Sequence, residues 1–245
     1  MEKNILASII LFSPDLERLK ENIDAIKGQV NHLLLIANGP TCSKAIQLYA
    51  SEHYITILEN RENEGIAFAL NQAMGFAKEN GYTWVLTLDQ DSVCPEQMVM
   101  VLVRHIVKDN IGIVCPGVID RNLEEDKIEQ EWKYVEKCIT SGCLTSVEAW
   151  ENVGGFTDKL FIDYVDFDYC AKLKKRGYKI IMDTSVKLLH EVGHITQIKF
   201  KNLSYILYNH SAFRTYYYFR NVIYYYKTHQ DFVDVYEEKR ALIIR

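Results

Sequence analysis

Two aspartates separated by one residue follow an apolar stretch near the middle of the chain. The stretch covers residues 84–88, and Asp89-Gln90-Asp91 comes directly after it. Paired carboxylates at a strand end can share a hard divalent cation and the oxygens of a diphosphate, and the cation then offsets charge on a leaving phosphate. The alternative is an ordinary turn, because aspartate also favours turns at strand ends. The strand context and the features below favour metal binding.

A second acidic cluster lies in residues 161–170, where Asp163, Asp166 and Asp168 are interleaved with aromatic residues. The cluster precedes a helical stretch, and acids in the first turn of a helix complement the helix dipole. That role accounts for one of the three aspartates. A carboxylate in a partly apolar cleft can also act as general base for an alcohol, so we expect the cluster to contribute to catalysis.

His190 follows the strand-like residues 186–189. It is a candidate third metal ligand or phosphate contact, with His194 as the less favoured alternative. A single histidine is more often structural, so this assignment depends on the rest of the site.

The first half of the chain alternates strand-like and helix-like stretches. Apolar runs at residues 5–12, 32–37, 54–58 and 84–88 predict strands, and amphipathic patterns near Leu16 and from Gly65 predict helices. Such strands joined by helices predict an α/β fold with a mostly parallel sheet covered on both faces. Ligands bind beyond the carboxyl ends of these strands. The residues expected along that rim are Phe12, Ser13, Ala37, Asn38, Gly39, Asn60, Asp89, Gln90 and Asp91.

The pattern changes after residue 112. We expect short strands at residues 111–116, 139–146 and 180–183, and a charged surface loop at residues 121–133. The chain from residue 204 onward is expected to be helical and is rich in tyrosine.

Composition excludes several classes of protein. The 245-residue chain suits one large α/β domain or two small ones, and its net charge of -5 argues against broad attraction to nucleic acid. Six scattered cysteines without a CxxC pair suit reduced, partly buried thiols better than disulfides or a zinc site. The apolar start is too short for a membrane span and lacks the flanks of a signal peptide. We therefore expect a cytoplasmic protein, either soluble or peripheral at the inner face of the cell membrane.

Together these features resemble the family 2 glycosyltransferases with the GT-A fold, and especially their bacterial rhamnosyltransferase branch. The resemblance lies in residues 9–14, 60–71, 88–92, 141–142, 154–156, 161–170, 190–193 and 214–221. A single motif would be weak evidence, but this many motifs in the family's order, from Ile5 to about Lys227, make the resemblance specific. The resemblance implies a catalytic domain at 1–203, with a nucleotide-binding half at 1–112 and an acceptor-binding half at 113–203. A helical, aromatic and basic C-terminal segment at 204–245 follows.

The resemblance also implies roles for individual residues. Asp166 matches the catalytic base of inverting members, Asp91 the metal-binding acid, and His190 a histidine that completes the metal site. Asp89 matches an acid near the donor's ribose and metal-bound phosphates, and Arg220 an arginine that faces the diphosphate. The other residues expected to contact the donor are Phe12, Ser13, Asn38, Asn60, Gly65, Asn71 and Gln90.

The reaction implied is a single in-line displacement with inversion. Asp166 takes the proton of the acceptor hydroxyl, and Mg²⁺ or Mn²⁺ stabilises the departing nucleoside diphosphate. The implied donor is dTDP-rhamnose, with a UDP-hexose as the alternative. The implied acceptor is a glycan or lipid-linked saccharide of cell-surface polysaccharide synthesis.

Two positions depart from the family's pattern. Val165 stands where an acid usually precedes the base, so Asp163 or Asp168 is expected to take over its orienting role. Ala37-Asn38 replaces the common Asp-Asn pair, so the choice between uracil and thymine stays open.

Other interpretations remain for the C-terminal segment and for the whole chain. Tyrosines beside Arg214, Arg220 and Lys227 suit either the headgroup level of a membrane or a helix packed on the core, whereas nucleic acid binding is disfavoured by the acidic balance. A sugar-nucleotide pyrophosphorylase would need a Gly-rich basic loop after the first strand, which residues 12–15 lack. An inactive carbohydrate-binding relative is disfavoured because the acids at 89, 91 and 166 are all present.

Overall fold

The computed structural model describes residues 4–40, 42–120, 131–190, 196–200, 203–207 and 210–232, with only the backbone at 120, 190, 196–200 and 203–207. The strands are β1 (Ile5–Leu11), β2 (His32–Ala37), β3 (Thr56–Glu59), β4 (Trp84–Asp89), β5 (Ile111–Asp120), β6 (Trp132–Val135), β7 (Cys143–Ser146), β8 (Lys179–His190), β9 (Thr196–Phe200) and β10 (Leu203–Leu207). The helices are α1 (Leu16–Ile26), α2 (Lys44–Glu52), α3 (Ile66–Glu79), α4 (Met98–Val103), α5 (Val147–Val153), the short 3-10 helix η1 (Asp158–Leu160), α6 (Val165–Lys175) and α7 (Ala212–His229).

One sheet runs through the molecule in the order β3-β2-β1-β4-β7-β5-β8-β6. The first four strands are parallel. Beyond β4, strand β7 is antiparallel to both neighbours, β5 and β8 are parallel, and β6 is an antiparallel edge. The parallel expectation is therefore confirmed for the first half, and the second half is mixed.

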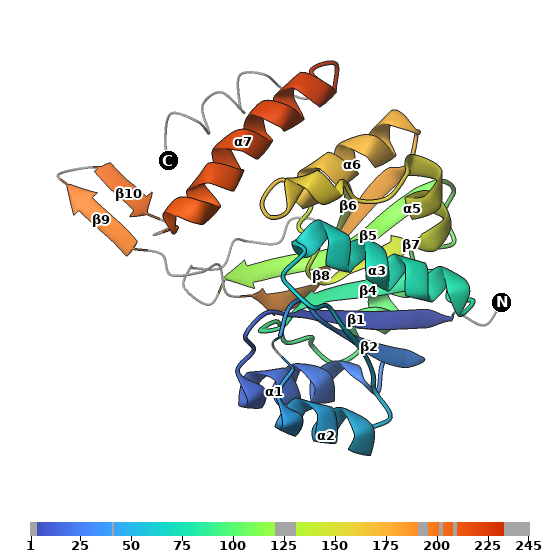
Figure 1. Ribbon diagram of the computed structural model, residues 1–245. Coiled ribbons are helices and arrows are strands. Elements are labelled where there is room, and N and C mark those ends of the chain that lie inside the picture. The colour runs from blue at the N-terminus through green and yellow to red at the C-terminus, as the bar shows by residue number, and fades with distance from the viewer. Residues whose placement is uncertain are drawn as a thin grey trace.

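Alternating side chains of the strands face two layers of helices (Figure 1). In β1, Ile9 and Leu11 belong to a core that also contains apolar residues of α1, α2 and α4. Leu6 and Ile10 face the opposite side and pack with α3, α5 and α6. Because both faces of β1 are covered, its sequence is an unbroken apolar run rather than an alternating one.

Several helices begin at polar residues that cap their first turn. Asp15 accepts a hydrogen bond from the Arg18 N–H at the start of α1, and Ser43 does the same for α2. Ser146 caps α5 and Ser211 caps α7 in the same way. Such caps satisfy backbone N–H groups that a helix leaves without a partner.

Three expectations from the sequence need correction. Residues 121–130 lie outside the described chain, but Trp132 and Lys133, expected in the same loop, begin strand β6. The segment from residue 204 begins as a strand, because β10 pairs with β9, and the helix starts only at Ala212. The predicted strand at 139–146 is formed only by β7, because the chain turns before Cys143.

The boundary expected between residues 112 and 113 falls inside β5, so the two halves share one sheet. Helix α7 packs on α6 through Tyr164, Ala171, Tyr218, Val222 and Tyr225. In the part of the chain described, no helix combines the length and apolar character that a membrane crossing requires.

Candidate active site

The carboxyl ends of β1 and β4 are tied together by Gln90. Its side-chain oxygen accepts a hydrogen bond from the Phe12 N–H (2.8 Å), and its amide nitrogen donates to the Phe12 carbonyl (3.1 Å). The Phe12 ring is left 55% exposed, and Ser13 follows with a positive φ of 51°. Phe12 is thus placed to contact a ligand at the rim, while Gln90 fixes the rim itself.

The turn after β4 carries Asp89 and Asp91, and it is held by the loop before β7 and by helix α1. The Asp89 N–H donates to the Ser141 hydroxyl (3.1 Å), which also hydrogen-bonds the Ser92 hydroxyl (2.8 Å). From α1, the amide of Asn22 donates to the Asp89 carbonyl (2.8 Å). The roles of Ser141 and Asn22 were not predicted. The signal for Asn22 was a buried polar residue on the apolar face of an amphipathic helix.

The end of β8 lies beside this turn. The Val93 N–H donates to the Leu189 carbonyl (3.3 Å) in an isolated antiparallel bridge. His190, the next residue, ends β8. Its backbone is therefore adjacent to the turn of Asp89 and Asp91, although its side chain, like all of His194, lies outside what the structure describes.

Two of the three aspartates in the second cluster are engaged in ion pairs. Asp163 forms a two-pronged pair with Arg214 of α7, at 3.1 and 3.2 Å. Asp168 is fully buried and contacts His229 (2.7 Å) and the Thr157 hydroxyl (2.6 Å). Because these two side chains hold α7 and the preceding loop, Asp166 is the acid of this cluster best placed for chemistry.

Asp166 is half-buried at the start of α6, and its Oδ1 accepts the Phe167 N–H (2.9 Å). Burial raises the pKa of its carboxyl to about 7, against the lowering effect of backbone hydrogen bonds, and the charges of Asp163 and Asp89 raise it further. A pKa near neutrality suits a general base.

The loop before Asp166 has an unusual backbone. Phe161, Asp163 and Tyr164 all have φ values near +60°, and Phe161 is the centre of a γ-turn in which the Ile162 N–H donates to the Leu160 carbonyl (2.7 Å). Non-glycine residues adopt these conformations at a cost of about 1–3 kcal/mol each. The loop must therefore be held by its surroundings.

Asn221 of α7 supplies much of that support. Its buried amide nitrogen donates to the carbonyls of Leu160, Ile162 and Asp163 at 2.7–2.9 Å. The Phe161 ring stacks on Tyr217 of the same helix, with ring centres 4.8 Å apart. Helix α7 is therefore part of the site's framework.

Asn38, Asn60 and Gly65, predicted to contact the donor, are joined by hydrogen bonds within the protein. Asn38 is 4% exposed; its amide nitrogen donates to Asn63 and to the Gly65 carbonyl. Its oxygen accepts from Asn60, which also exchanges hydrogen bonds with Gln72. At Gly65, a Cβ would lie 2.7 Å from Phe161. These residues hold the rim of β2 and β3 and the start of α3 against the loop.

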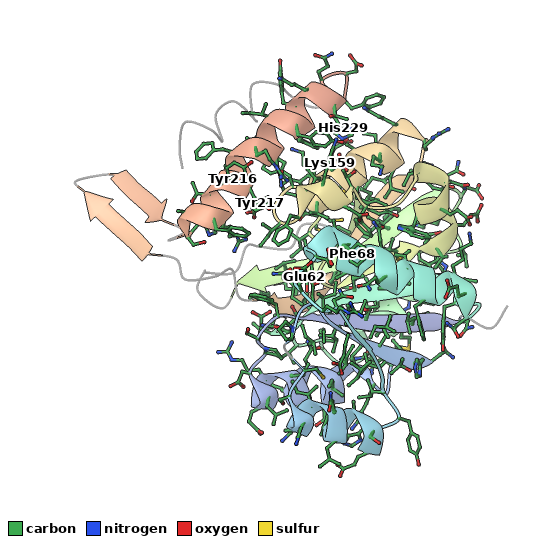
Figure 2. The ribbon with its side chains drawn as sticks, viewed as in Figure 1. Glu62, Phe68, Lys159, Tyr216, Tyr217 and His229 are labelled. Carbon is green, nitrogen blue, oxygen red and sulfur yellow. The ribbon has the colours of Figure 1, made fainter. Side chains whose placement is uncertain are left out.

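Asn71 and Arg220 are likewise engaged within the protein. Asn71 donates to the Phe156 carbonyl and to Asp158, and accepts from the Trp150 indole. Arg220 donates to the carbonyls of Lys159 and Leu160 and lies over the Tyr217 ring. Figure 2 shows Tyr217 on α7 and Lys159 near the same helix, where its amine lies over the Tyr224 ring. A direct contact of either predicted residue with a diphosphate would require these bonds to be exchanged.

The acids suit a divalent cation by their chemistry. Asp89 and Asp91 offer hard carboxylate oxygens of the kind that Mg²⁺ and Mn²⁺ prefer. The repulsion between Asp89 and Asp166 indicates an excess of negative charge that a cation would offset. The residues present therefore fit the ion that the sequence predicted.

Comparison with known proteins shows the family of the chain. A model of glycosyl transferase family 2 matches residues 12–176, which is more than half of the chain and includes Asp89, Asp91 and Asp166. The chain belongs to glycosyl transferase family 2. It is 28% identical over 238 residues to the dTDP-rhamnosyl transferase RfbF of Shigella flexneri, a match that covers 90% of this chain and 79% of that protein.

Two solved structures of glycosyltransferases share the fold. One is GalNAc-T7 with UDP, GalNAc and Mn²⁺ (TM-score 0.65, 14% identity, covering 77% of this chain and 44% of that one). The other is TarS 1–349 of S. aureus (TM-score 0.56, 10% identity, 74% and 60%). The chain spans less than two thirds of either structure. The similarity confirms the GT-A fold predicted for this family 2 member.

Proposed function

We propose that this family 2 member is a metal-dependent, inverting glycosyltransferase that moves a sugar from a nucleotide diphosphate to a hydroxyl group. The observation that carries the proposal is Asp166, whose half-buried carboxyl has a pKa of about 7 beside Asp89. In the same cluster, Asp163 is paired with Arg214 and Asp168 is paired with His229. These contacts support Asp166 as the proposed proton acceptor, with Asp89 and Asp91 as the proposed metal-binding acids.

Asp166 accepts the proton of the acceptor hydroxyl as that oxygen attacks the anomeric carbon. The attack comes from the side opposite the leaving diphosphate, so the anomeric configuration inverts. Asp89 and Asp91, with His190 as a further ligand, would hold Mg²⁺ or Mn²⁺, which supplies positive charge for the leaving diphosphate. Proton transfer to a positioned base contributes about 10²–10⁴-fold to rate.

The donor we propose is dTDP-rhamnose, because the curated relative is named as a dTDP-rhamnosyl transferase. A UDP-hexose is the alternative. The exposed ring of Phe12 at the rim suits contact with the nucleotide base. The acceptor we propose is a glycan or a lipid-linked saccharide used in cell-surface polysaccharide synthesis.

Helix α7 suits an acceptor at a membrane surface. Phe213, Tyr216, Phe219 and Ile223 are exposed and recur at helical spacing. Apolar and amphipathic side chains beside arginines are typical of helices at the headgroup level. We therefore propose a cytoplasmic enzyme with a peripheral membrane contact, testable by liposome flotation of wild type and a Phe213→Ser/Ile223→Ser variant.

A panel of nucleotides tests the proposed function directly. The protein is heated with dTDP, UDP, GDP or their sugar conjugates, with and without Mn²⁺. Ligands that bind only the folded state raise the melting temperature. We expect the largest increase with dTDP-rhamnose and Mn²⁺, followed by transfer to a saccharide acceptor. Equal effects of all nucleotides, or effects that do not depend on the metal, would overturn the proposal.

A further inference from the structure

Four cysteines that are separated in the sequence lie close together in the interior. Cys115 lies on β5, Cys143 begins β7, Cys138 lies in the loop before β7, and Cys170 lies on α6. We refer to these four residues as the thiol cluster. All are free and buried, and all belong to the same side of the core.

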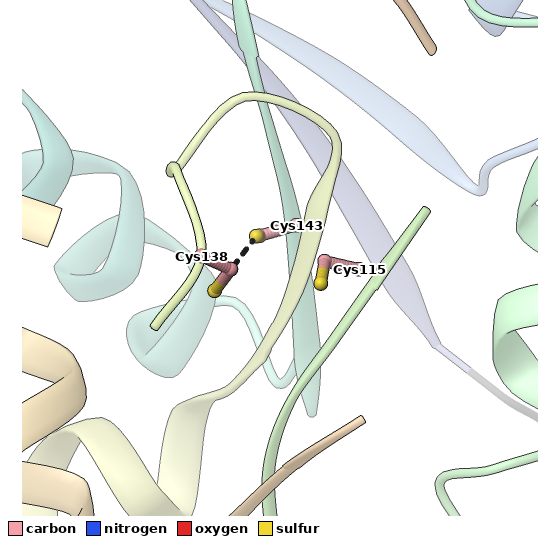
Figure 3. A group of neighbouring side chains, drawn as sticks. All are labelled: Cys115, Cys138 and Cys143. Atoms are coloured by element: carbon pink, nitrogen blue, oxygen red, sulfur yellow. Dashed lines mark hydrogen bonds between the residues drawn. The ribbon is translucent and has the colours of Figure 1, made fainter. Parts of the chain in front are cut away.

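The sulfur atoms lie at the spacing of a metal–thiolate site. Those of Cys115, Cys138 and Cys143 are all within 4.8 Å of one another, and Figure 3 shows Cys115 on a strand beside the loop and strand that carry Cys138 and Cys143. The Cys138 Sγ is 3.6 Å from Cys143 Sγ and 3.8 Å from Cys170 Sγ. In a tetrahedral zinc site with Zn–S bonds of about 2.3 Å, neighbouring sulfurs are about 3.8 Å apart.

We propose that the thiol cluster binds one Zn²⁺ ion through Cys115, Cys138 and Cys143, and that Cys170, which lies against Cys138 but outside the group of three, turns its side chain to supply the fourth sulfur. The ligands are soft and polarizable, so the site differs in kind from the carboxylate site for Mg²⁺ or Mn²⁺. Binding releases the thiol protons. No redox step is involved, because Zn²⁺ has a single stable oxidation state in proteins.

One neighbouring side chain, Tyr169, supports a charged state of the thiol cluster. The Tyr169 hydroxyl is buried without a hydrogen-bond partner in the described part of the chain. Tyr169 adjoins Cys170 on α6 and belongs to the same side of the core as the thiol cluster. A thiolate held by Zn²⁺ is a better acceptor for such an O–H donor than a neutral thiol.

A metal here would act on the active site through the backbone. Cys138 and Cys143 flank Ser141, which holds the Asp89 N–H and the Ser92 hydroxyl. Cys170 lies on the same helix as Asp166. One ion would therefore link the loop that supports the Asp89 turn to the helix that carries the proposed base.

The alternative is that the four residues are small apolar packing groups, since free cysteine is often fully buried. Cys94 provides the matched control, because it is also buried but belongs to the opposite side of the core. Substitution of Cys94 should then leave metal binding unchanged, whereas substitution within the thiol cluster should remove it.

Metal content and Co²⁺ absorption test the proposal. Reduced wild-type protein, treated with a mild chelator to remove weakly held ions, is expected to retain one equivalent of Zn²⁺. Replacement of Zn²⁺ by Co²⁺ should produce a near-ultraviolet sulfur-to-metal charge-transfer band. Cys138→Ser and Cys143→Ser are expected to lose the ion and the band, while Cys94→Ser and Asp91→Asn keep both.

Two results would overturn the proposal. One is folded, reduced wild-type protein that shows neither bound Zn²⁺ nor a Co²⁺ band in the presence of excess metal. The other is a band that survives in Cys138→Ser and Cys143→Ser. The wild-type spectrum decides the question even where a cysteine variant fails to fold, and retention in Asp91→Asn separates this site from the active-site cation.

Discussion

The turn that carries Asp89 and Asp91 is positioned by the sheet, whereas the loop that carries Asp166 is positioned by a helix far along the chain. The turn follows β4, whose register with β1 is fixed by consecutive parallel pairs. The loop depends on three residues with positive φ and on contacts from Arg214 and Asn221. One half of the site thus comes from regular structure, and the other from strained backbone held by α7.

This difference has a consequence for substitutions. Changes at the β4 turn should alter ligand binding with little effect on the fold, because sheet register does not depend on the carboxylates. Changes at the α7 contacts should alter both the stability of the protein and the placement of Asp166.

Removal of the Asp91 charge is expected to have the largest effect. Asp91→Asn should lower kcat/KM by about 10³-fold or more, because the cation that offsets charge on the leaving group is lost. The Mn²⁺-dependent stabilisation by nucleotide should disappear as well. Glu96→Gln, an exposed acid five residues on, is the control and should retain both. Metal-dependent donor binding by Asp91→Asn would assign the metal to other ligands.

Loss of the Asn221 amide should destabilise the α7 side of the site. Asn221→Ala removes the donor of the Ile162 and Asp163 carbonyls, whereas the Leu160 carbonyl keeps its bonds from Ile162 and Arg220; the expected cost is about 2–3 kcal/mol in the free energy of unfolding. Urea denaturation measures this change, and kcat should fall with it. Asn80→Ala removes one exposed bond to Phe76 and is expected to cost about 0.5 kcal/mol or less. Equal losses in the free energy of unfolding for Asn221→Ala and Asn80→Ala would show that α7 does not support the loop.

Two glycines at α3 separate loop contact from helix propensity. Gly65→Ala places a Cβ 2.7 Å from Phe161 at a φ of +88°, so we expect a loss of about 2 kcal/mol and lower activity. Gly75→Ala, inside the same helix with open space around it, should gain about 0.5–1 kcal/mol. A thermal or urea titration of both variants measures the difference. If Gly65→Ala left stability and activity unchanged, this result would argue against tight packing of the loop on α3.

The buried Asp166 should have a smaller effect on the pH dependence of stability. Its folded pKa of about 7 lies above the unfolded value of about 3.9. The stability it contributes is therefore full below pH 4 and is lost as the pH rises to about 7. Asp166→Asn removes the charge that burial disfavours, so the variant should be more stable than wild type at pH 8. The gain should be only on the order of 1 kcal/mol, because the side chain is half-buried. If Asp166→Asn were no more stable than wild type at pH 8, the pKa of Asp166 would be that of an ordinary aspartate.

Much of the first half of the molecule could be predicted from sequence. Strands β1, β2 and β4 and helices α1 and α3 are strongly periodic, and the parallel-sheet rule places Phe12, Asn38 and Asp89 at one edge. The rule locates backbones but not side-chain partners. It could not show that the Asn38 amide nitrogen donates its hydrogen bonds to Asn63 and to the Gly65 carbonyl.

The second half was harder to predict, because its geometry depends on contacts between residues far apart in sequence. Nothing near Asp163 indicates that Arg214 binds it, and nothing near Asp168 indicates His229. The resemblance singled out Asp166, and the structure supplies a physical reason in the engagement of the other two acids. The thiol cluster was missed because its members lack the local CxxC spacing and meet only in the folded chain.

The pH dependence of kcat/KM in wild type and Asp166→Asn, at fixed Mn²⁺, tests the central claim most directly. The account predicts a wild-type rate that rises with pH and levels off at about pH 7, since the base must be ionised. In Asp166→Asn, activity should fall about 10³-fold and the rising limb should vanish, while donor binding is unchanged. Near-normal turnover by that variant, or an unchanged rising limb, would contradict the assignment of Asp166 as the base.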